Sequence, residues 1–437
     1  MENYATNVGK HLSSDQVTVR HDVVVTNHYF TLPLSYALPD GEHIKVFARE
    51  LVSTNNKNSN APWLLYLQGG PGFGSPRPEI PSGWVQEALK NYRILLLDQR
   101  GTGLSTPVTA ALTESGTPQE QAQHLTHFRA DNIVRDAEAI RQLLNIECWY
   151  TLGQSFGGFC TLTYLSLAPE ALAGSVITGG LPGLENSAKD VYHLTYPRMA
   201  TRWQEYLSWY PEDQLRLNAV ADKVREGGVL LPSGEELSVP RLQQLGMYLG
   251  GNARVDQLHY LLEEAFLPNG ELSPSFLEKV FAHISFAANP LYAVMHESIY
   301  GQNQATGWAA DKLRTEYPGF VSSAADTLPT GEHIIKQFFD VDPALIPFKE
   351  VADLLAHKDD WPSLYDADRL ADNSVPVAAA VYGDDVYVPS ELSLQTAQKV
   401  KGLQVWYTED YHHDGLRADG ASIFQRLAGM AAMPGYA

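Results

Sequence analysis

The sequence of 437 residues is longer than one typical domain, which predicts either two domains or one large domain that carries an insertion. Hydrophobic residues make up 44% of the chain, an ordinary share for a globular protein with a buried core. The formal net charge of −20 argues against a nucleic-acid partner, because phosphate binding needs a basic surface.

The N-terminus and the cysteines bear on the cellular compartment. Residues 1–7 have neither the basic start nor the apolar stretch of a signal peptide, and no apolar run reaches membrane-spanning length. Cys148 and Cys160 are too few for a disulfide framework, and both lie in apolar segments where a buried thiol is expected. We therefore predict a cytoplasmic protein that has no membrane partner.

The first fifty residues are typical of antiparallel strands. The runs Val17–Val25, Tyr29–Leu34 and Ile44–Ala48 are rich in β-branched and aromatic residues, and a turn pair at Asp40-Gly41 separates the last two. This pattern predicts a β-meander.

From Trp63 onward the sequence changes to short, continuously apolar runs bounded by glycine. These runs are Trp63–Leu67, Tyr92–Leu97, Trp149–Leu152 and Gly174–Thr178, and a helical pattern at Asp131–Leu144 lies among them. Strands that are apolar on both faces and alternate with helices indicate a mostly parallel sheet covered by helices on both sides.

This alternation stops near Pro182. From there to about Asp366 the sequence is helical, aromatic and interrupted by prolines, and strands return only with Val375–Tyr382 and Leu403–Tyr407. The fold class predicted is α/β, with a helical cap inserted into the sheet. The predicted organisation is a first core part at 1–182 that includes the antiparallel strands, a helical cap domain at 183–366, and a second core part at 367–437.

The segment Gly153-Gln154-Ser155-Phe156-Gly157-Gly158 lies between an apolar run and a helix-prone stretch. A serine flanked by small residues at such a junction predicts a nucleophile elbow. The glycines are needed because the turn strains the serine backbone, and side chains there would collide with the neighbouring strand and helix. The string also arises by chance in a glycine-rich chain, so partners elsewhere must decide its meaning.

A nucleophilic serine needs a base and an acid that orients the base. In a doubly wound hydrolase sheet the acid and then the histidine follow the serine along the chain, each in a loop after a strand. Residues 383–389 and 409–417 are such loops. The chain therefore supplies both partners in the required order.

Each loop offers two neighbouring candidates. Asp385 is the preferred acid because it stands four residues before Pro389, as in hydrolases of this kind, and Asp384 is the alternative. His413 is the preferred base because the turn pair that follows it lets the imidazole project from the loop, and His412 is the alternative.

The segment Gly69-Gly70-Pro71-Gly72, directly after the run Trp63–Leu67, is the candidate oxyanion turn. Glycines allow backbone N–H groups to approach a developing negative charge, and the N–H groups of Gly70 and Phe156 would be the donors. A phosphate-binding loop is excluded because no Gly-Lys-Ser/Thr follows and the proline lacks an N–H.

Three motifs together resemble the proline iminopeptidases, which are serine peptidases of the α/β-hydrolase fold. They are Gly69-Gly70-Pro71-Gly72, Asp98-Gln99-Arg100-Gly101-Thr102-Gly103-Leu104-Ser105 and Gly153-Gln154-Ser155-Phe156-Gly157-Gly158. The resemblance covers nearly the whole core, and the middle segment resembles the larger-cap branch of that family. Gln68 departs from the commoner pattern, which has histidine before the two glycines. The residues themselves predict that Asp98–Gly101 form a buried polar loop that braces the oxyanion turn.

The resemblance implies an aminopeptidase that releases N-terminal proline from peptides through an acyl-enzyme. Such an enzyme must bind a free amine, and a buried cation requires a carboxylate. Glu297 and Glu332 resemble the acidic cap residues of the larger iminopeptidases, and the alternative is that both are solvated surface side chains. Aromatic cap residues together with Phe156 are expected to form an apolar pocket for the pyrrolidine ring.

Two other functions remain open from the sequence. One is a different serine hydrolase of the same fold, such as an esterase or a tripeptidyl-type aminopeptidase. The other is a non-catalytic binding protein, which would normally have lost a member of the triad.

The chain has no His-Glu-x-x-His motif and its histidines are scattered, so we expect no metal and no cofactor.

Overall fold

A computed structural model describes residues 8–77 and 79–436, and its centre is a nine-stranded sheet of order β1-β2-β3-β5-β4-β6-β7-β8-β9. The strands are β1 Lys10–Arg20, β2 Val23–Pro33, β3 His43–Ser53, β4 Trp63–Leu67, β5 Arg93–Asp98, β6 Trp149–Gln154, β7 Leu172–Thr178, β8 Val377–Tyr382 and β9 Leu403–Thr408. The pairs β1–β2, β2–β3 and β3–β5 are antiparallel, and every pair from β5–β4 to β8–β9 is parallel. The predicted α/β fold class is therefore confirmed.

The N-terminal meander forms, but its first strand differs from the prediction. The run Val17–Val25 was expected to be one strand, whereas the chain reverses at His21 and Asp22, whose φ angles are 52° and 59°. Arg20 pairs with Val23 across this two-residue turn, which joins β1 to β2. The prediction was wrong because valines on both sides hide a turn that contains no glycine. The predicted absence of a signal peptide at residues 1–7 lies outside the described residues.

Helices cover both faces of the sheet because alternate strand residues are buried on opposite sides. Leu64 and Tyr66 of β4 belong to one core cluster, together with apolar residues of α1 Gly83–Ala88, α16 Gly415–Ala418 and α17 Gly420–Met430. Leu65 and Leu67 belong to the other, together with residues of α2 Pro118–Leu125, α3 Ala130–Leu143, α4 Phe156–Leu167 and α15 Ser390–Lys399. This two-sided burial explains why the strands read as continuous apolar runs.

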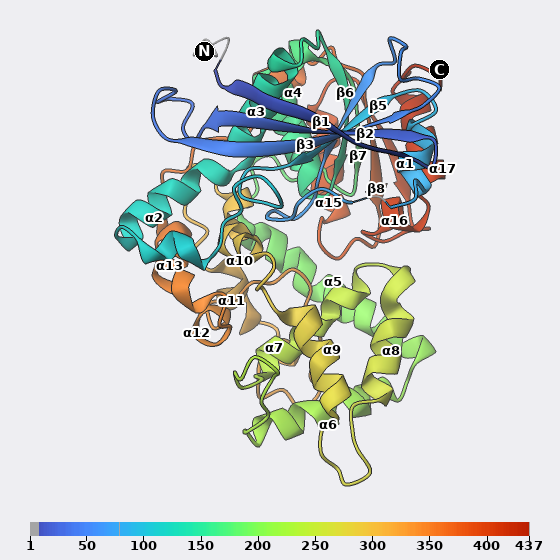
Figure 1. Ribbon diagram of the computed structural model, residues 1–437. Coiled ribbons are helices and arrows are strands. Elements are labelled where there is room, and N and C mark those ends of the chain that lie inside the picture. The colour runs from blue at the N-terminus through green and yellow to red at the C-terminus, as the bar shows by residue number, and fades with distance from the viewer. Residues whose placement is uncertain (1–7, 78, 437) are drawn as a thin grey trace.

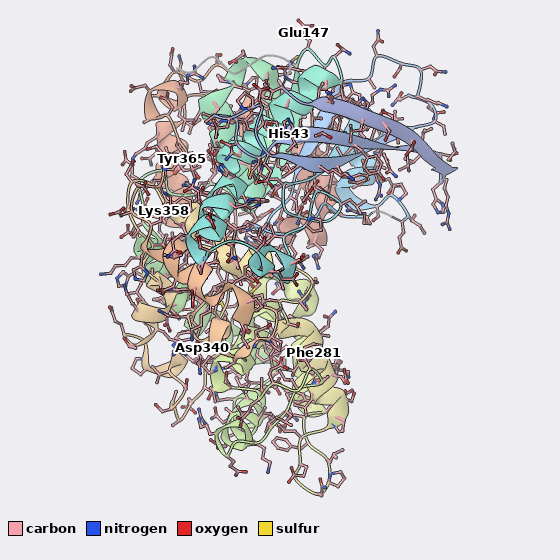
Figure 2. The ribbon with its side chains drawn as sticks, turned by 60° about the vertical axis from the view of Figure 1, so that its left-hand side comes forward. His43, Glu147, Phe281, Asp340, Lys358 and Tyr365 are labelled. Atoms are coloured by element: carbon pink, nitrogen blue, oxygen red, sulfur yellow. The ribbon has the colours of Figure 1, made fainter. Side chains whose placement is uncertain are left out.

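The segment between β7 and β8 is helical, and most of it lies to one side of the core, below it in Figure 1. Its helices are α5 Ala188–Trp209, α6 Asp213–Arg225, α7 Val239–Gln243, α8 Val255–Glu263, α9 Pro274–Ile284, α10 Pro290–Met295, α11 Ala309–Arg314, α12 Phe338–Val341, α13 Lys349–His357 and α14 Ala367–Ala371. Residues 183–366 are all described, and they form only two isolated β-bridges and no strand. In Figure 2, Phe281 and Asp340 mark this insertion, and His43 and Glu147 mark the core.

The two cysteines differ in burial. Cys160 of α4 is buried as expected, whereas Cys148 is exposed just before β6, so the prediction of two buried thiols was wrong for Cys148. Cys148 ends the loop that leads into the strand, and the apolar run begins in the sheet only at Trp149.

Across residues 8–77 and 79–436, none of the helices is long and apolar enough to cross a bilayer.

A buried ion pair ties the loop after β5 to α3. The Arg100 guanidinium donates to both carboxylate oxygens of Asp136 of α3 at 2.8 and 2.5 Å, and the pair is only 1% exposed. Arg100 also donates to the carbonyl oxygen of Leu34, and the Tyr36 hydroxyl donates to Asp136 at 2.8 Å. Every charge in this group has a partner, as burial in a low dielectric requires.

Replacing Asp136 with alanine should lower the free energy of unfolding by about 3–5 kcal/mol, because the Arg100 guanidinium then stays buried without a counter-charge. Urea unfolding followed by tryptophan fluorescence measures this difference. The control is Lys401→Met, which removes an exposed pair with Asp372 and should change the stability little. Equal, small losses in the two variants would contradict the importance of the buried pair.

Candidate active site

Ser155 stands at a sharp turn between β6 and α4. Its backbone has φ 54° and ψ −124°, a conformation that costs free energy and needs support from its surroundings. The support is local, because the Ser155 N–H donates to the carbonyl of Thr178 at 3.0 Å and the Ser155 carbonyl accepts from the Gly158 N–H at 2.7 Å. The strained turn therefore joins the end of β7 to the first turn of α4.

The glycines of the elbow are required by close backbone contacts. A Cβ atom on Gly157 would lie 1.9 Å from the carbonyl oxygen of Leu67, the last residue of β4. A Cβ on Gly158 would lie 2.3 Å from the carbonyl oxygen of Gly180. Real Cβ atoms do not approach other atoms so closely, so only glycine lets α4 pack this tightly against the sheet.

His413 connects Ser155 to Asp385. Its Nε2 atom lies 2.9 Å from Ser155 Oγ, and its Nδ1 atom lies 2.8 Å from Asp385 Oδ2. The other carboxylate oxygen of Asp385 accepts from the N–H groups of Tyr387 and Val388 at 2.8 and 3.0 Å. The acid follows β8 and the histidine follows β9, so the parallel order of these strands brings both to the same edge of the sheet.

The neighbouring candidates point elsewhere. His412 Nδ1 lies 3.3 Å from the backbone carbonyl of Asp384, and His412 Nε2 faces Glu205 at 3.9 Å. The structure therefore brings Asp385 and His413 to Ser155, whereas Asp384 and His412 contact each other away from the serine.

The surroundings of His413 favour its protonated form. Burial lowers the pKa of this imidazole, but the charge of Asp385, its hydrogen bond and the charge of Glu332 together raise the pKa above its ordinary value. The rings of Tyr387 and His413 pack in a T-shaped arrangement with their centroids 5.0 Å apart. An imidazole held in this way can accept a proton from the serine and keep its orientation.

The glycine turn after β4 lies beside the serine. A Cβ on Gly69 would be 3.0 Å from Ser155 Cβ, and a Cβ on Gly72 would be 2.4 Å from the backbone nitrogen of Tyr292 in the insertion. Gly70 has φ +133°, which side chains rarely adopt. Phe156 is the first residue of α4, so its N–H has no acceptor within the helix. The turn and the helix start thus approach Ser155 together.

Asp98 and Gln99 hold the glycine turn at its two ends. Asp98 accepts from the Ser75 and Leu104 N–H groups, each at 2.9 Å, and forms an ion pair with Arg77. The Gln99 amide donates to the Gln68 carbonyl at 3.0 Å. Both side chains are buried, and they brace the turn as the sequence predicts.

Glu332 lines a small cavity between the insertion and the core. Other residues of this wall are Tyr192, Thr195, Tyr300 and Tyr387. Burial raises the pKa of Glu332 to about 7; the charge of His413 opposes this shift, and that of Asp385 adds to it. The carboxyl group is therefore within electrostatic reach of the triad.

Glu297 has a different environment. Its two carboxylate oxygens accept from the N–H groups of Ala309 and Ala310 at 3.1 and 2.9 Å, so the side chain binds the N-terminus of α11. Burial raises the pKa of Glu297 to about 7 in spite of these bonds. This contact was missed from the sequence because the helix start at Ala309 follows Trp308, which carries no capping side chain.

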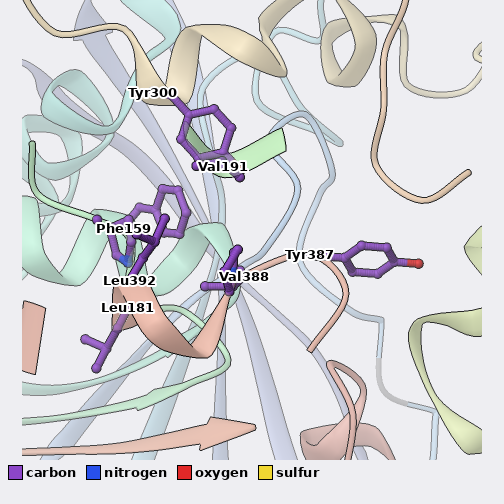
Figure 3. A pocket seen from close by; sticks show the side chains of 10 residues that line it. Phe159, Leu181, Val191, Tyr300, Tyr387, Val388 and Leu392 are labelled. Atoms are coloured by element: carbon purple, nitrogen blue, oxygen red, sulfur yellow. The ribbon is translucent and has the colours of Figure 1, made fainter. Parts of the chain in front are cut away.

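A second, apolar cavity adjoins that of Glu332. Figure 3 shows Phe159, Leu181 and Leu392 on one side, with the Tyr387 phenol turned away from them. Val191, Tyr300 and Tyr387 belong to both cavities. Phe159 lines this cavity, and Phe156, which the sequence assigns to a pocket for the pyrrolidine ring, lies next to Phe159 with the ring centroids 6.0 Å apart. Within the described residues no group of three or more His, Cys, Asp or Glu side chains is arranged to hold a metal ion.

A Ser-His-Asp chain in loops at the carboxyl edge of a mostly parallel sheet defines an α/β hydrolase. The protein family described as "alpha/beta hydrolase fold" matches residues 62–232. A proline iminopeptidase of Aeromonas sobria is 46% identical over 92% of this chain and 95% of its own length. The chain therefore belongs to the proline iminopeptidase family.

Two further similarities complete the comparison. The proline iminopeptidase aneH of Aspergillus aculeatus is 36% identical over 91% of each chain. Among solved structures, the 2-hydroxy-6-oxo-6-phenylhexa-2,4-dienoate hydrolase of Rhodococcus has a TM-score of 0.44 and 13% identity, and the match covers 96% of this chain and 99% of that one.

Replacing Gly157 with alanine should abolish the reactivity of Ser155, because the new Cβ forces α4 away from the Leu67 carbonyl and the elbow with it. Labelling by a fluorophosphonate, which reacts with activated serines, measures this loss. The control is Gly234→Ala, since a Cβ there meets nothing within 4 Å, although φ is +94°. That variant should lose about 1 kcal/mol of stability and label normally. Normal labelling of Gly157→Ala would contradict the steric argument.

Proposed function

We propose that this protein is a serine aminopeptidase that releases N-terminal proline from peptides. The observation that carries the proposal is the hydrogen-bonded chain from Asp385 through His413 to Ser155 in a member of the proline iminopeptidase family. The two full-length relatives are both named proline iminopeptidases, and their similarity extends through the insertion as well as the core.

The geometry supports an acyl-enzyme reaction. Ser155 Oγ attacks the prolyl carbonyl carbon while His413 Nε2 takes the hydroxyl proton, and Asp385 stabilises the imidazolium that forms. The N–H groups of Gly70 and Phe156 donate to the oxyanion. His413 then gives its proton to the leaving amine, and water releases proline from Ser155 by the same steps in reverse.

Amine recognition is assigned to Glu332. This carboxyl group lines a cavity, and it acts electrostatically on His413. A protonated N-terminal amine would supply the cation that a buried carboxylate lacks. Glu297 is not assigned this role, because its oxygens already accept hydrogen bonds from two backbone N–H groups. It holds the start of α11 in place. Residues 183–366 thereby act as the cap domain of the enzyme, set between the core parts 1–182 and 367–437.

The alternatives of the same fold differ in what they require at the substrate's N-terminus. An esterase or an endopeptidase needs no free amine. A tripeptidyl-type enzyme needs space for three residues between the nucleophile and the site that binds the amine. The small size of the cavity that contains Glu332 favours removal of a single residue. A cytoplasmic location stays a prediction from the sequence.

Ser155→Ala should lower kcat for a prolyl arylamide by at least about 10³-fold, because the reaction loses its nucleophile. Release of the arylamine from prolyl, hydroxyprolyl and alanyl substrates, each with a free or an acetylated N-terminus, measures activity and specificity together. The wild-type enzyme should cleave the free prolyl substrate and leave the acetylated one intact. Equal cleavage of both would make the protein an endopeptidase or esterase.

Glu332→Gln should raise KM for the free prolyl substrate about 10- to 100-fold, because a charge-assisted hydrogen bond is lost. The pKa of Glu332 is about 7, so its carboxylate is lost as the pH falls through 7, and wild-type KM should rise there. In the variant KM should no longer follow this ionisation. The acidic limb of the pH profile of kcat should move to lower pH in Glu332→Gln, since the charge of Glu332 raises the pKa of His413 in the wild-type enzyme.

The comparison variant for this measurement is Glu297→Gln. It should lower the melting temperature, through weaker binding of the N-terminus of α11, and change KM less. A wild-type KM and pH dependence in Glu332→Gln would remove Glu332 from amine recognition.

A further inference from the structure

Arg198 of α5, a residue of the insertion, contacts the loop that carries Asp385. Its Nη1 atom donates to the carbonyl oxygens of Gly383 and Asp385 at 2.8 and 3.1 Å. Its Nη2 atom donates to Ser390 Oγ at 3.0 Å and to Glu391 at 2.5 Å. The Arg198 side chain is 18% exposed, and its bonds to the two carbonyls and to Ser390 are partly buried, whereas Glu391 is exposed.

These contacts span the whole acid loop, which we define as residues 383–390. Gly383 is the first residue after β8, and Ser390 is the first residue of α15. The Ser390 hydroxyl also donates to the Gly383 carbonyl at 3.0 Å, which closes the loop on itself. One guanidinium therefore bridges the start, the end and the Asp385 backbone of the loop.

The planar shape of the side chain matters here. A guanidinium presents several N–H donors in a fixed fork, so it can bind two carbonyls and a hydroxyl at once. A lysine ammonium carries the same charge on a single nitrogen and cannot reach all these acceptors from one position. The contact pattern is therefore specific to arginine.

The course of α5 places Arg198 at this loop. Pro197 lies inside the helix and lacks the N–H that would bind the carbonyl of His193, and the Tyr317 hydroxyl donates to that carbonyl at 3.3 Å instead. Val191 and Thr195, earlier in the same helix, line the cavity that contains Glu332. One helix thus forms the cavity wall and contacts the acid loop.

We propose that Arg198 is a positioning residue for the peptidase reaction. It acts through the acid loop and holds Asp385 in place opposite His413 Nδ1. The inference rests on the proposed function, because it concerns the same triad. Arg198 itself lines neither cavity, so it acts on the reaction through the acid loop and not by direct contact with the substrate.

The test compares Arg198→Met and Arg198→Lys with the wild-type enzyme on the free prolyl arylamide. Arg198→Met should lower kcat about 10- to 100-fold, since a small displacement of the triad has such an effect, and raise KM by a smaller factor, because residues of the same loop line the cavities. The acidic limb of kcat should move to lower pH, because the Asp385 contact that raises the pKa of His413 is weakened. Arg198→Lys should recover part of kcat.

The matched control is Arg225→Met. Arg225 donates to the carbonyls of Ser322 and Ala324, to the Thr327 hydroxyl and to Asp222, so its contacts are of the same kinds but lie far along the insertion from the acid loop. This variant should lose comparable stability and keep the wild-type kcat and pH profile. Wild-type kcat in Arg198→Met, or an equal loss of kcat in Arg225→Met, would overturn the proposal.

The rate of fluorophosphonate labelling of Ser155 separates this proposal from the proposed function. The labelling rate depends on the triad and needs no peptide substrate. If the wild-type protein labels but cleaves no prolyl substrate, the proposed function fails, and slower labelling of Arg198→Met alone still supports the positioning role. Equal labelling rates in the wild-type protein, Arg198→Met and Arg225→Met would overturn it.

Discussion

The contact between the first turn of α4 and the end of β4 sets the geometry of the whole site. Gly157 packs so closely on the Leu67 carbonyl that no side chain fits between them. This contact holds Ser155 in its strained conformation at the start of the helix. Because the glycine turn begins just after Leu67, the same contact also fixes the distance between that turn and Ser155. Serine, helix N-terminus and turn are therefore linked by this one packing interaction.

The insertion and the core meet at the acid loop, which serves both. The N–H groups of Tyr387 and Val388 bind the Asp385 carboxylate, and the side chains of the same two residues line the apolar cavity. The Tyr387 ring also packs on His413 in a T-shaped arrangement. A displacement of the cavity wall therefore also displaces the acid and the base. The Arg198 guanidinium, which binds the acid loop from the insertion, limits this displacement.

The sequence predicted what depends on local patterns. Buried parallel strands are apolar on both faces, so Trp63–Leu67 and Val375–Tyr382 were recognisable, and the order of serine, acid and histidine followed from the topology. Contacts between distant residues were not recognisable. Nothing near Glu297 indicates that it binds the start of α11, and Arg198 has no motif because most of its acceptors are backbone carbonyls and a hydroxyl far along the chain. The prediction of one strand across His21 was wrong for the opposite reason: the local pattern is misleading there, because the residues on both sides of the turn are typical of a single strand.

The balance of charge around His413 links catalysis to amine recognition in the proposed function. Asp385 accepts hydrogen bonds from two N–H groups and the imidazole, so both of its buried oxygens have partners. The Tyr292 hydroxyl donates to Glu332 and favours its ionised form, but burial outweighs this bond and raises the pKa of Glu332 to about 7. A cationic amine that enters the cavity supplies the missing counter-charge and favours the ionised form of Glu332. A blocked N-terminus brings no cation, so it would leave a buried carboxyl group without compensation. Selectivity for a free N-terminus then follows from the burial that makes Glu332 unstable as an isolated charge.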